Sequence, residues 1–414
     1  MLLKNSMDTS PHEANYRWYI LALAALTHTF AAAIPSMCLP VLFKEIAEDL
    51  GLDLVQVGIL WGLGALPGIA TALLGGVIGD RFGARRTLAV ICLLAGLAGA
   101  LRGVANDFFS FGAIVFLSGL LTPMIPMNVH KTCGIWFSRR QLGLANGVVS
   151  MGMALGFTIA SLISATILSP WLGGWRNVLF FYGAITVAIS LPWYLARPAP
   201  RRSETSSGEG DTKSMRQAVL HTIRLKNVWL LGLALLGISG CVQGTLGYLP
   251  LYLRGIGWPP ASADGALAAF HTMSMMFVIP IALWADKLGS RKNVLMMAAL
   301  MIITGVGLLT VVDGLAVWLA VGIAGLVRDG FMAVFMTMII ETKGVGAAYA
   351  GTAVGLVMIF SGLGSLIAPP LGNSLAQFAP DLPFLLWTAM TIGGMFGLYF
   401  TQERRVASAP VAIG

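Results

Sequence analysis

The sequence predicts an all-α membrane protein of twelve transmembrane helices arranged in two six-helix halves. Hydrophobic residues make up 57% of the chain and charged residues only 11%, a balance that excludes an ordinary soluble domain. Uncharged stretches recur that reach the roughly 20 apolar residues needed to cross a hydrocarbon core. One polar stretch, between Arg197 and Lys226, interrupts this pattern midway.

The apolar segments are predicted to be helices because each is too long and too continuously apolar for a strand of a membrane barrel. The first segment is longer than the apolar region of a secretory signal and follows a leader containing Asp8 and Glu13, so we expect it to be retained. The expected spans are 18–43, 54–79, 87–105, 108–136, 142–168, 175–196, 227–253, 262–285, 293–312, 315–341, 345–372 and 382–401.

The polar stretch predicts a division of the chain into three parts. Residues 1–196 are expected to form the first six-helix bundle, 197–226 a cytoplasmic linker, and 227–414 the second bundle. The linker contains Pro, Ser and Gly together with several charges, which is typical of a flexible, solvated segment. Its later portion, from about Met215 to Arg224, is amphipathic. It either lies along the membrane surface or is the polar lead into the seventh span.

Basic residues predict the orientation in the membrane. Twenty Lys and Arg residues fall in the alternate segments that include the N-terminus and the linker, and only four fall in the opposite set: Lys44, Arg102, Arg176 and Arg254. Short loops rich in Lys and Arg stay on the cytoplasmic side. Both termini and the linker should therefore face the cytoplasm, in a protein of the inner (plasma) membrane. The same bias accounts for the net charge of +8, so no nucleic-acid partner is expected.

A short motif occurs twice. After the second span the chain reads G-V-I-G-D-R-F-G-A-R-R from Gly76, and after the eighth it reads A-D-K-L-G-S-R-K from Ala285. Three pairs of residues are each separated by 206 positions: Asp80 and Asp286, Gly83 and Gly289, and Arg85 and Arg291. The equal spacing indicates that the two halves of the chain are repeats of one unit.

The repeated motif resembles the signature of the major facilitator superfamily, from which the first copy departs mainly at Ala84. The resemblance implies two six-helix pseudo-repeats that carry a small solute across a bilayer by alternating access, without covalent chemistry and as a monomer. By resemblance, Asp80, Arg81 and Arg85, with Asp286 and Arg291 in the second copy, lock the cytoplasmic side closed when the outer side is open. Gly83 and Gly289 are expected to form tight turns with positive φ. The alternative is that these loops only set the topology.

Polar residues inside the spans are the candidates for substrate and proton binding, because a charged residue at mid-membrane costs about 2.5–3.5 kcal/mol on insertion scales. The resemblance implies that the first, fourth, seventh and tenth spans line the central cavity, and most of the candidates lie on these spans. They are His28, Asn128, His130, Lys131, Gln243, His271, Arg328 and Asp329.

Arg328 lies near the middle of its span. It either binds an anionic substrate through its planar set of donors or is neutralised by a carboxylate. Because adjacent residues on a helix point in different directions, we expect direct ligation or pairing with another helix rather than with Asp329. Asp329 is then a candidate proton carrier or a partner for His130, Lys131 or a backbone donor.

The remaining candidates are weaker. Asn128 and Lys131 are three residues apart on one helix face, which suits a cavity lining, although Lys131 is also close enough to the interface to reach water. His28 is a candidate for substrate or proton binding, or for helix packing, and His130 is a candidate for proton coupling. Gln243 is a candidate substrate ligand, whereas packing is favoured for His271.

The sequence therefore predicts a gradient-driven carrier of a small organic, anionic solute, with uptake by proton symport. One alternative is a drug or metabolite exporter working by proton antiport, which apolar side chains such as Phe331 and Met332 favour but the absence of a Gly-Pro motif in the fifth span weakens. Another is a membrane sensor that does not transport. No cofactor or metal is expected, because the cysteines are scattered without the spacing of a metal or disulfide site.

Overall fold

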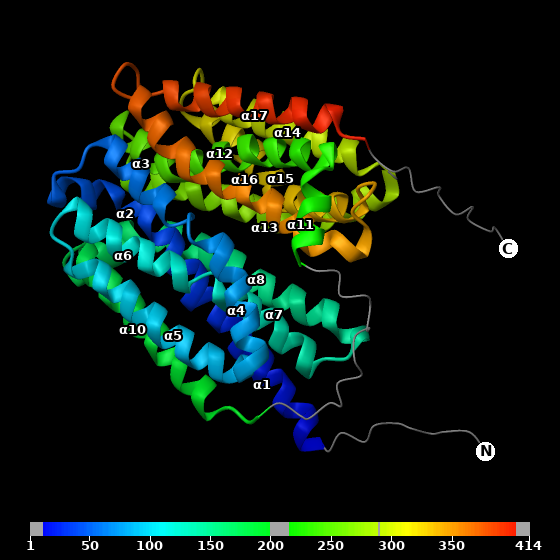
Figure 1. Cartoon of the computed structure of the whole chain (residues 1–414). Helices are drawn as coiled ribbons and strands as arrows, with labels where there is room; N and C mark the ends of the chain where they lie inside the picture. Colours follow the sequence, from blue (N-terminus) through cyan, green and yellow to red (C-terminus); the bar gives the residue numbers. More distant parts are fainter. Residues whose placement is uncertain (1–10, 199–214, 289, 403–414) are drawn as a thin grey trace, which may run out of the picture.

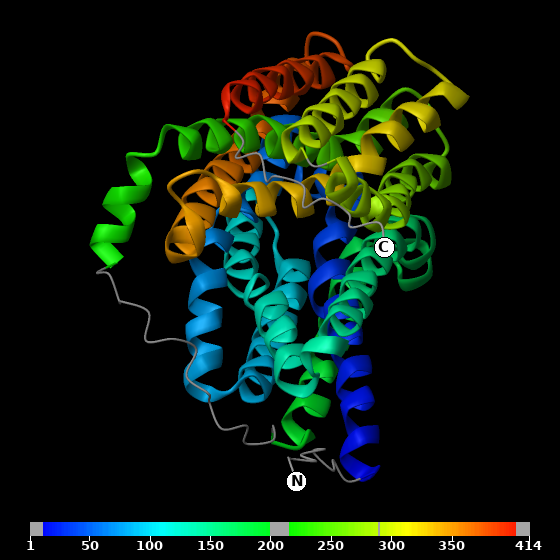
Figure 2. The same ribbon diagram turned by 90° about the vertical axis from the view of Figure 1, so that its right-hand side faces the viewer.

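The computed structural model describes residues 11–198, 215–288 and 290–402, and in these ranges every regular element is a helix. The helices form two bundles, seen from two directions in Figures 1 and 2. The N-terminal bundle consists of α1 (Pro11–Thr27), η1 (His28–Ala33), α2 (Ile34–Leu50), α3 (Leu54–Leu63), α4 (Gly68–Phe82), α5 (Ala84–Leu101), η2 (Arg102–Val104), α6 (Phe108–Leu121), α7 (Met124–Trp136), α8 (Arg139–Ile163), η3 (Ser164–Leu168), α9 (Ser169–Leu172) and α10 (Trp175–Leu195).

The C-terminal bundle follows the short helix α11 (Met215–Ile223), which falls within the amphipathic part of the predicted linker. It consists of α12 (Lys226–Gly255), α13 (Pro260–Leu288), α14 (Arg291–Leu308), α15 (Leu315–Glu341), α16 (Gly346–Leu375) and α17 (Leu382–Phe400). In the N-terminal bundle η1 and η3 are π-helical turns that continue the neighbouring α-helices, and η2 is a 3₁₀ turn. Such π-helical turns often accompany functional sites.

Eleven helical stretches of the described chain are long and apolar enough to cross a membrane. The second predicted span is the exception, because a turn at residues 64–67 splits it into α3 and α4. Pro67 has no N–H to donate to the preceding turn, and Leu66 N–H instead donates to the carbonyl of Leu63 over 3.3 Å. One continuous second helix was therefore the wrong expectation, and α3 with α4 completes the twelve-span fold.

The first span continues to Leu50 rather than ending at residue 43. Acidic side chains of its last turns are held by the same bundle: Glu45 Oε2 accepts a hydrogen bond of 2.5 Å from Ser169, and Asp49 forms an ion pair of 2.8 Å with Arg176. Gly51 then ends the helix with a φ of 63°. An apolar pattern alone could not show that the helix extends beyond the hydrocarbon region, because these charged residues are satisfied by tertiary contacts.

A helix cap fixes the start of the fourth span. Asp107 Oδ1 accepts hydrogen bonds from the backbone N–H groups of Phe109 and Ser110, at 2.8 and 2.9 Å. The hydrogen bonds from Ser110 are the main reason why the pKa of Asp107, which lies outside the spans, is lowered. The cap satisfies two of the N–H groups that the first turn of α6 leaves free.

The two bundles meet mainly where α3 packs on α16, α8 on α13, and α2 on α12, and α3 also contacts α12. The approach of α3 is close because glycines face the partner helix. A Cβ built on Gly58 would lie 2.7 Å from the Cα atom of Pro370, and one on Gly62 would lie 2.5 Å from the carbonyl oxygen of Leu366. The backbones of α3 and α16 therefore touch with no side chain between them.

We call the end of the molecule at which α1 begins and α17 ends the inner end, and the opposite end the outer end (Figure 1). At the outer end Asn373 Nδ2 donates to the carbonyl of Leu54 over 2.8 Å, joining α16 to the start of α3. Toward the inner end the ribbons of the two bundles diverge (Figure 1). The bundles are thus closed against each other at the outer end in this conformation.

Candidate functional site

Arg328 and Asp329 lie on α15 where the C-terminal bundle faces the N-terminal bundle. Arg328 Nη1 is 3.0 Å from Asp329 Oδ1, so the two adjacent residues form an ion pair. The guanidinium carbon is 5.6 Å from the ring centre of Phe157, which belongs to α8 of the other bundle. The side chains of Arg328 and Asp329 remain 23% and 35% exposed. Both groups are therefore at the interface and still accessible.

The expectation that Arg328 would not pair with its neighbour was wrong. The Cβ atoms of adjacent helical residues do point apart, but the long arginine side chain bends back over the shorter aspartate and closes the distance to 3.0 Å. Side-chain length, which the argument from helical spacing left out, decides the contact. The role of Arg328 in substrate binding remains a prediction.

His271 of α13 contacts the same aromatic ring. Its ring centre is 5.2 Å from that of Phe157, and the residue is only 2% exposed. Within the described chain neither ring nitrogen of His271 has a hydrogen-bond partner. Ser274, one helical turn farther along α13, accepts a 3.1 Å hydrogen bond from the backbone N–H of Asp329. The sequence favoured packing for His271, and its contacts with Phe157 and Phe270 fit that role, but a buried imidazole without a partner is uncommon.

The histidines of the first and fourth spans form a separate group. His28 Nδ1 is 3.0 Å from the carbonyl oxygen of Val149, which can only accept, so Nδ1 carries the proton. The ring of His130 stands edge-on to His28 with 5.5 Å between centres, and its Nδ1 is 3.0 Å from Asn146 Oδ1. His28 Nε2 has no partner among the described residues. It is therefore a buried nitrogen with an unused lone pair, in the π-helical turn η1 of the first span.

Asn128 and Lys131 are turned away from Arg328, toward α4. The side-chain amide of Asn128 is fully buried and donates to the carbonyls of Gly75 and Met124, at 2.9 Å each. A Cβ on Gly79 would lie 1.9 Å from Asn128 Oδ1, so the glycine makes room for the amide. Lys131 forms an ion pair with Asp80. The structure thus joins the predicted ligand Lys131 to the predicted gate residue Asp80, and it does not bring Asn128 or Lys131 to Arg328.

Gln243 of α12 lines a cavity of about 220 Å³ in the outer half of the N-terminal bundle. Its backbone carbonyl accepts a 2.7 Å hydrogen bond from Trp61 Nε1 of α3, so the contact also joins the two bundles. Arg102, at the end of the third span, lines the same cavity and is only 5% exposed. The sequence analysis counted Arg102 with the outer basic residues, and Arg102 does lie at the outer end of the third span, but it is buried there. Gly99 could have indicated this burial. Helical side chains lean toward the N-terminus of the helix, and a glycine one turn before Arg102 leaves space for the arginine side chain.

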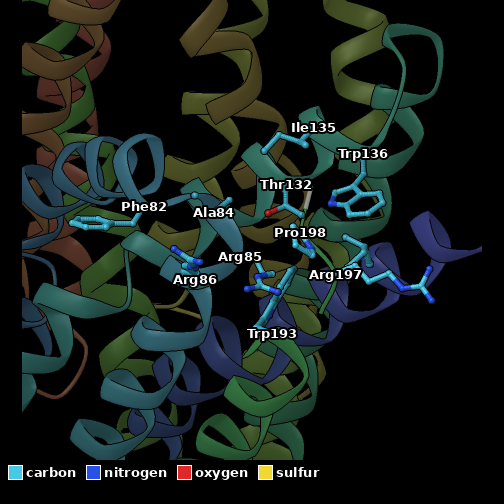
Figure 3. Close-up of a pocket in the computed structure, with 12 residues that line it drawn as sticks. Phe82, Ala84, Arg85, Arg86, Thr132, Ile135, Trp136, Trp193, Arg197 and Pro198 are labelled. Atoms are coloured by element: carbon cyan, nitrogen blue, oxygen red, sulfur yellow. The ribbon is translucent and has the colours of Figure 1, made fainter. Parts of the chain in front are cut away.

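The first copy of the repeated motif forms the turn between α4 and α5. Gly83 has a φ of 83°, as expected for a glycine in a tight turn. Arg85 Nη1 donates to the carbonyl of Ala196 at the end of α10, whereas Arg81 is exposed. Beside the turn lies a pocket of about 250 Å³, in which Figure 3 shows Arg85 next to Trp193. The motif therefore ties spans two, three, four and six of the N-terminal bundle together at the inner end.

The second copy is only partly described. Gly289 and the side chain of Asp286 lie outside what the structure describes. Arg291, at the start of α14, forms two hydrogen bonds with Glu341, from Nε to Oε2 at 2.6 Å and from Nη2 to Oε1 at 3.0 Å. Glu341 is the last residue of α15, the helix that carries Arg328. A gating role of either copy remains a prediction.

An ion pair that the sequence analysis missed lies at the outer end. Arg254 Nη2 is 2.6 Å from both carboxylate oxygens of Asp264, and the two side chains are 6% and 0% exposed. Thr166 of η3, in the other bundle, donates to Asp264 Oδ2 over 2.7 Å. Arg254, which the sequence analysis counted among the outer basic residues, belongs to the last turn of α12, and Asp264 belongs to the first turns of α13. Their position at the ends of long helices gave no signal that they would be buried.

Comparisons with known proteins agree on one family. The sequence matches the model of the Major Facilitator Superfamily over residues 21–348 and again over 256–413. It is 23% identical to the probable sulfoacetate transporter SauU of Cupriavidus necator over 95% of each chain, and 27% identical to Monocarboxylate transporter 11 of Homo sapiens over 96% of this chain and 85% of that protein. The crystal structure of the nucleoside transporter NupG shares the fold, with a TM-score of 0.74 at 13% identity over 93% of this chain and 98% of that one. The chain therefore belongs to the major facilitator superfamily and is a multi-pass membrane transporter.

Proposed function

We propose that this transporter carries a small organic anion together with a proton, by uptake across the inner membrane. The observation that carries the proposal is the Arg328–Asp329 ion pair, which lies between the bundles and remains partly exposed. A carboxylate or sulfonate on the substrate has the geometry to take the place of Asp329 on the guanidinium. The coupling of substrate binding to proton binding then follows from the charge of the site.

The empty site is electrically neutral as long as Asp329 is ionised and paired with Arg328. An anion that binds Arg328 leaves the Asp329 carboxylate without its partner in a region of low dielectric, where an unpaired charge is costly. Protonation of Asp329 removes that charge. Anion and proton therefore bind together and leave the net charge of the site unchanged. His28, with its free Nε2, is a second candidate for the proton.

The relatives support an anionic substrate. The probable sulfoacetate transporter and Monocarboxylate transporter 11 carry, by their names, a sulfonated carboxylate and monocarboxylates. The basic inner loops support a cytoplasmic location for both termini. With that orientation, the end at which the two bundles are closed against each other faces the outside. Residues 1–196 and 227–414 then rock against each other about the linker 197–226, within a single chain.

Counterflow in proteoliposomes tests this function. Purified protein is reconstituted with one unlabelled candidate inside and the labelled form outside, across acetate, lactate, sulfoacetate, glucose and choline. We expect accumulation of carboxylates or sulfonates and not of glucose or choline. Arg328→Gln removes about 3 kcal/mol of charge-assisted hydrogen bonding to the anion. The dissociation constant of the anion should therefore rise roughly 100-fold.

Arg328→Lys and Arg176→Gln are the comparison variants. Lysine keeps the charge but not the planar pair of donors, so Arg328→Lys should fall between wild type and Arg328→Gln. Arg176 lies in the N-terminal bundle and pairs with Asp49, so its replacement should leave counterflow intact. Accumulation of choline or glucose alone, or normal counterflow in Arg328→Gln, would show that the anion proposal is wrong.

A further inference from the structure

Arg102 is a buried arginine whose side chain runs into the protein instead of out toward water. It follows the last residue of α5, at the outer end of the third span. From there a long side chain has an easy path to the surface. Instead the position of a Cβ on Gly99, one turn back along the helix, is 3.5 Å from Arg102 Nη2, and the residue is only 5% exposed. The guanidinium therefore lies inside the bundle.

The guanidinium has few partners there. Nη1 donates to the carbonyl of Pro35 over 3.2 Å, and Nε is buried without a hydrogen-bond partner in the described part of the chain. No described carboxylate forms a salt bridge with it. Arg254 provides the contrast, because it is buried to a similar extent but touches both oxygens of Asp264. A buried charge is normally paired, so the absence of an anion beside Arg102 calls for an explanation.

A cavity adjoins Arg102. Its volume of about 220 Å³ is far above the roughly 10–15 Å³ that one water needs on the same measure. Five spans contribute to its wall, and the seventh span does so from the other bundle. Besides Arg102, the polar side chains of the wall are Ser36, Ser118, Thr122 and Gln243. The cavity thus combines one unpaired cation, neutral hydrogen-bonding groups and enough room for a small organic ion.

We infer that Arg102 and this cavity form an anion-binding site for the carboxylate or sulfonate group of the transported substrate, separate from Arg328. The inference rests on the proposed function, because it takes the transported solute to be an anion. The bond from Trp61 to the Gln243 carbonyl joins the two bundles at the wall of the cavity. When the bundles part at the outer end, this bond breaks and the site opens toward the outside. Arg102 then offers an incoming anion an unpaired positive charge before the anion reaches Arg328 in the middle of its span.

Anion binding to the purified full-length protein tests the inference. Thermal stabilisation and equilibrium binding are measured in Tris sulfate with acetate, lactate, sulfoacetate and chloride, for wild type, Arg102→Gln and the control Lys44→Gln. Loss of a charge-assisted bond should weaken binding of the preferred organic anion by about tenfold or more in Arg102→Gln. Lys44 is an exposed residue of α2, so Lys44→Gln should bind as wild type does. The comparison with chloride distinguishes a site for the organic substrate from a site for a resident inorganic ion.

A second variant protects the test against a folding defect. Ser118→Met fills the cavity and leaves Arg102 in place, so it should also weaken organic-anion binding about tenfold. Organic-anion binding that is unchanged in both Arg102→Gln and Ser118→Met overturns the inference while the proposed function stands. If only the chloride effect is lost in Arg102→Gln, the site holds an inorganic ion and the substrate assignment is wrong. Wild-type protein that binds none of the organic anions contradicts the proposed function itself.

Discussion

Arg102 and Arg254 occupy comparable positions and have opposite surroundings. Each lies at the outer end of a span, and each is nearly fully buried. Arg254 is neutralised by Asp264, whose carboxylate also bonds Thr166 of the other bundle. Arg102 has a single backbone carbonyl and a cavity. The difference separates a charge that holds the protein together from a charge that is kept available for a ligand.

The largest expected effect tests this difference through stability. Arg254→Met leaves the fully buried Asp264 without its cation, which should destabilise the protein by about 3–5 kcal/mol. Arg102→Met removes a charge that has no carboxylate partner, so the ligand-free protein should be as stable as wild type or more so. Thermal unfolding of both variants in the same detergent measures the contrast. Equal destabilisation by the two substitutions would show that Arg102 is structural as well.

The next largest effect concerns Asp329, whose pairing with Arg328 makes it the switchable counterpart of Asp264. Asp329→Asn cannot take up the coupling proton, so an inward pH gradient should no longer accelerate uptake, whereas exchange of substrate at equal pH should continue. Uptake driven by imposed pH gradients, beside counterflow of the same vesicles, measures both properties. A variant that still responds to the gradient would assign the proton to another group, for which His28→Gln is the next variant to test.

A smaller effect is expected at the inner end. The Asp80 side chain is 75% exposed, so its pair with Lys131 contributes little to stability, about 0–1 kcal/mol. If the pair acts as a gate, Asp80→Asn should slow turnover several-fold while the dissociation constant of the substrate stays near that of wild type. Transport rates and binding are measured on matched amounts of folded protein. Unchanged turnover at normal expression would leave Asp80 with a role in topology alone.

The smallest effect is expected from Thr166, the residue through which the other bundle contacts the Arg254–Asp264 pair. Thr166→Val loses one hydrogen bond, while Arg254 still pairs with Asp264, so it should shift the balance toward an open outer end by less than about 1 kcal/mol. A cysteine placed at Gln243 in a background without other reactive cysteines should then react faster with an impermeant thiol reagent from outside. No change in that rate would mean that the bond is not broken as the bundles move.

The sequence predicted those features that depend on local composition. Apolar length located the spans, and the glycine at position 83 marked a turn with positive φ. The split of the second span was missed, although Pro67 was visible, because apolar length does not reveal where a helix bends. Asn128 and Lys131 were expected to line the cavity from one face of the fourth span, but they contact Gly75 and Asp80 instead, because the helix that they face depends on how the spans pack.

The same limit applies to the site. A position at the end of an apolar stretch looks identical for an arginine exposed in a loop and for one folded back into the bundle. Only the packing of spans one to four shows that Arg102 is buried. Arg328 was identifiable because it interrupts a span, whereas its pairing with Asp329 depended on side-chain conformation.

The glycine contacts between α3 and α16 offer a means of controlling which state the transporter adopts. An alanine at position 58 or 62 would place its methyl group 2.5–2.7 Å from backbone atoms of the partner helix, too close for the outer end to stay closed without movement. The open arrangement suffers no such clash, so each added methyl acts as a wedge that raises the energy of one state and not of the other. Gly58→Ala and Gly62→Ala are accordingly the substitutions with which to trap the transporter open to the outside, the state in which the cavity beside Arg102 is accessible.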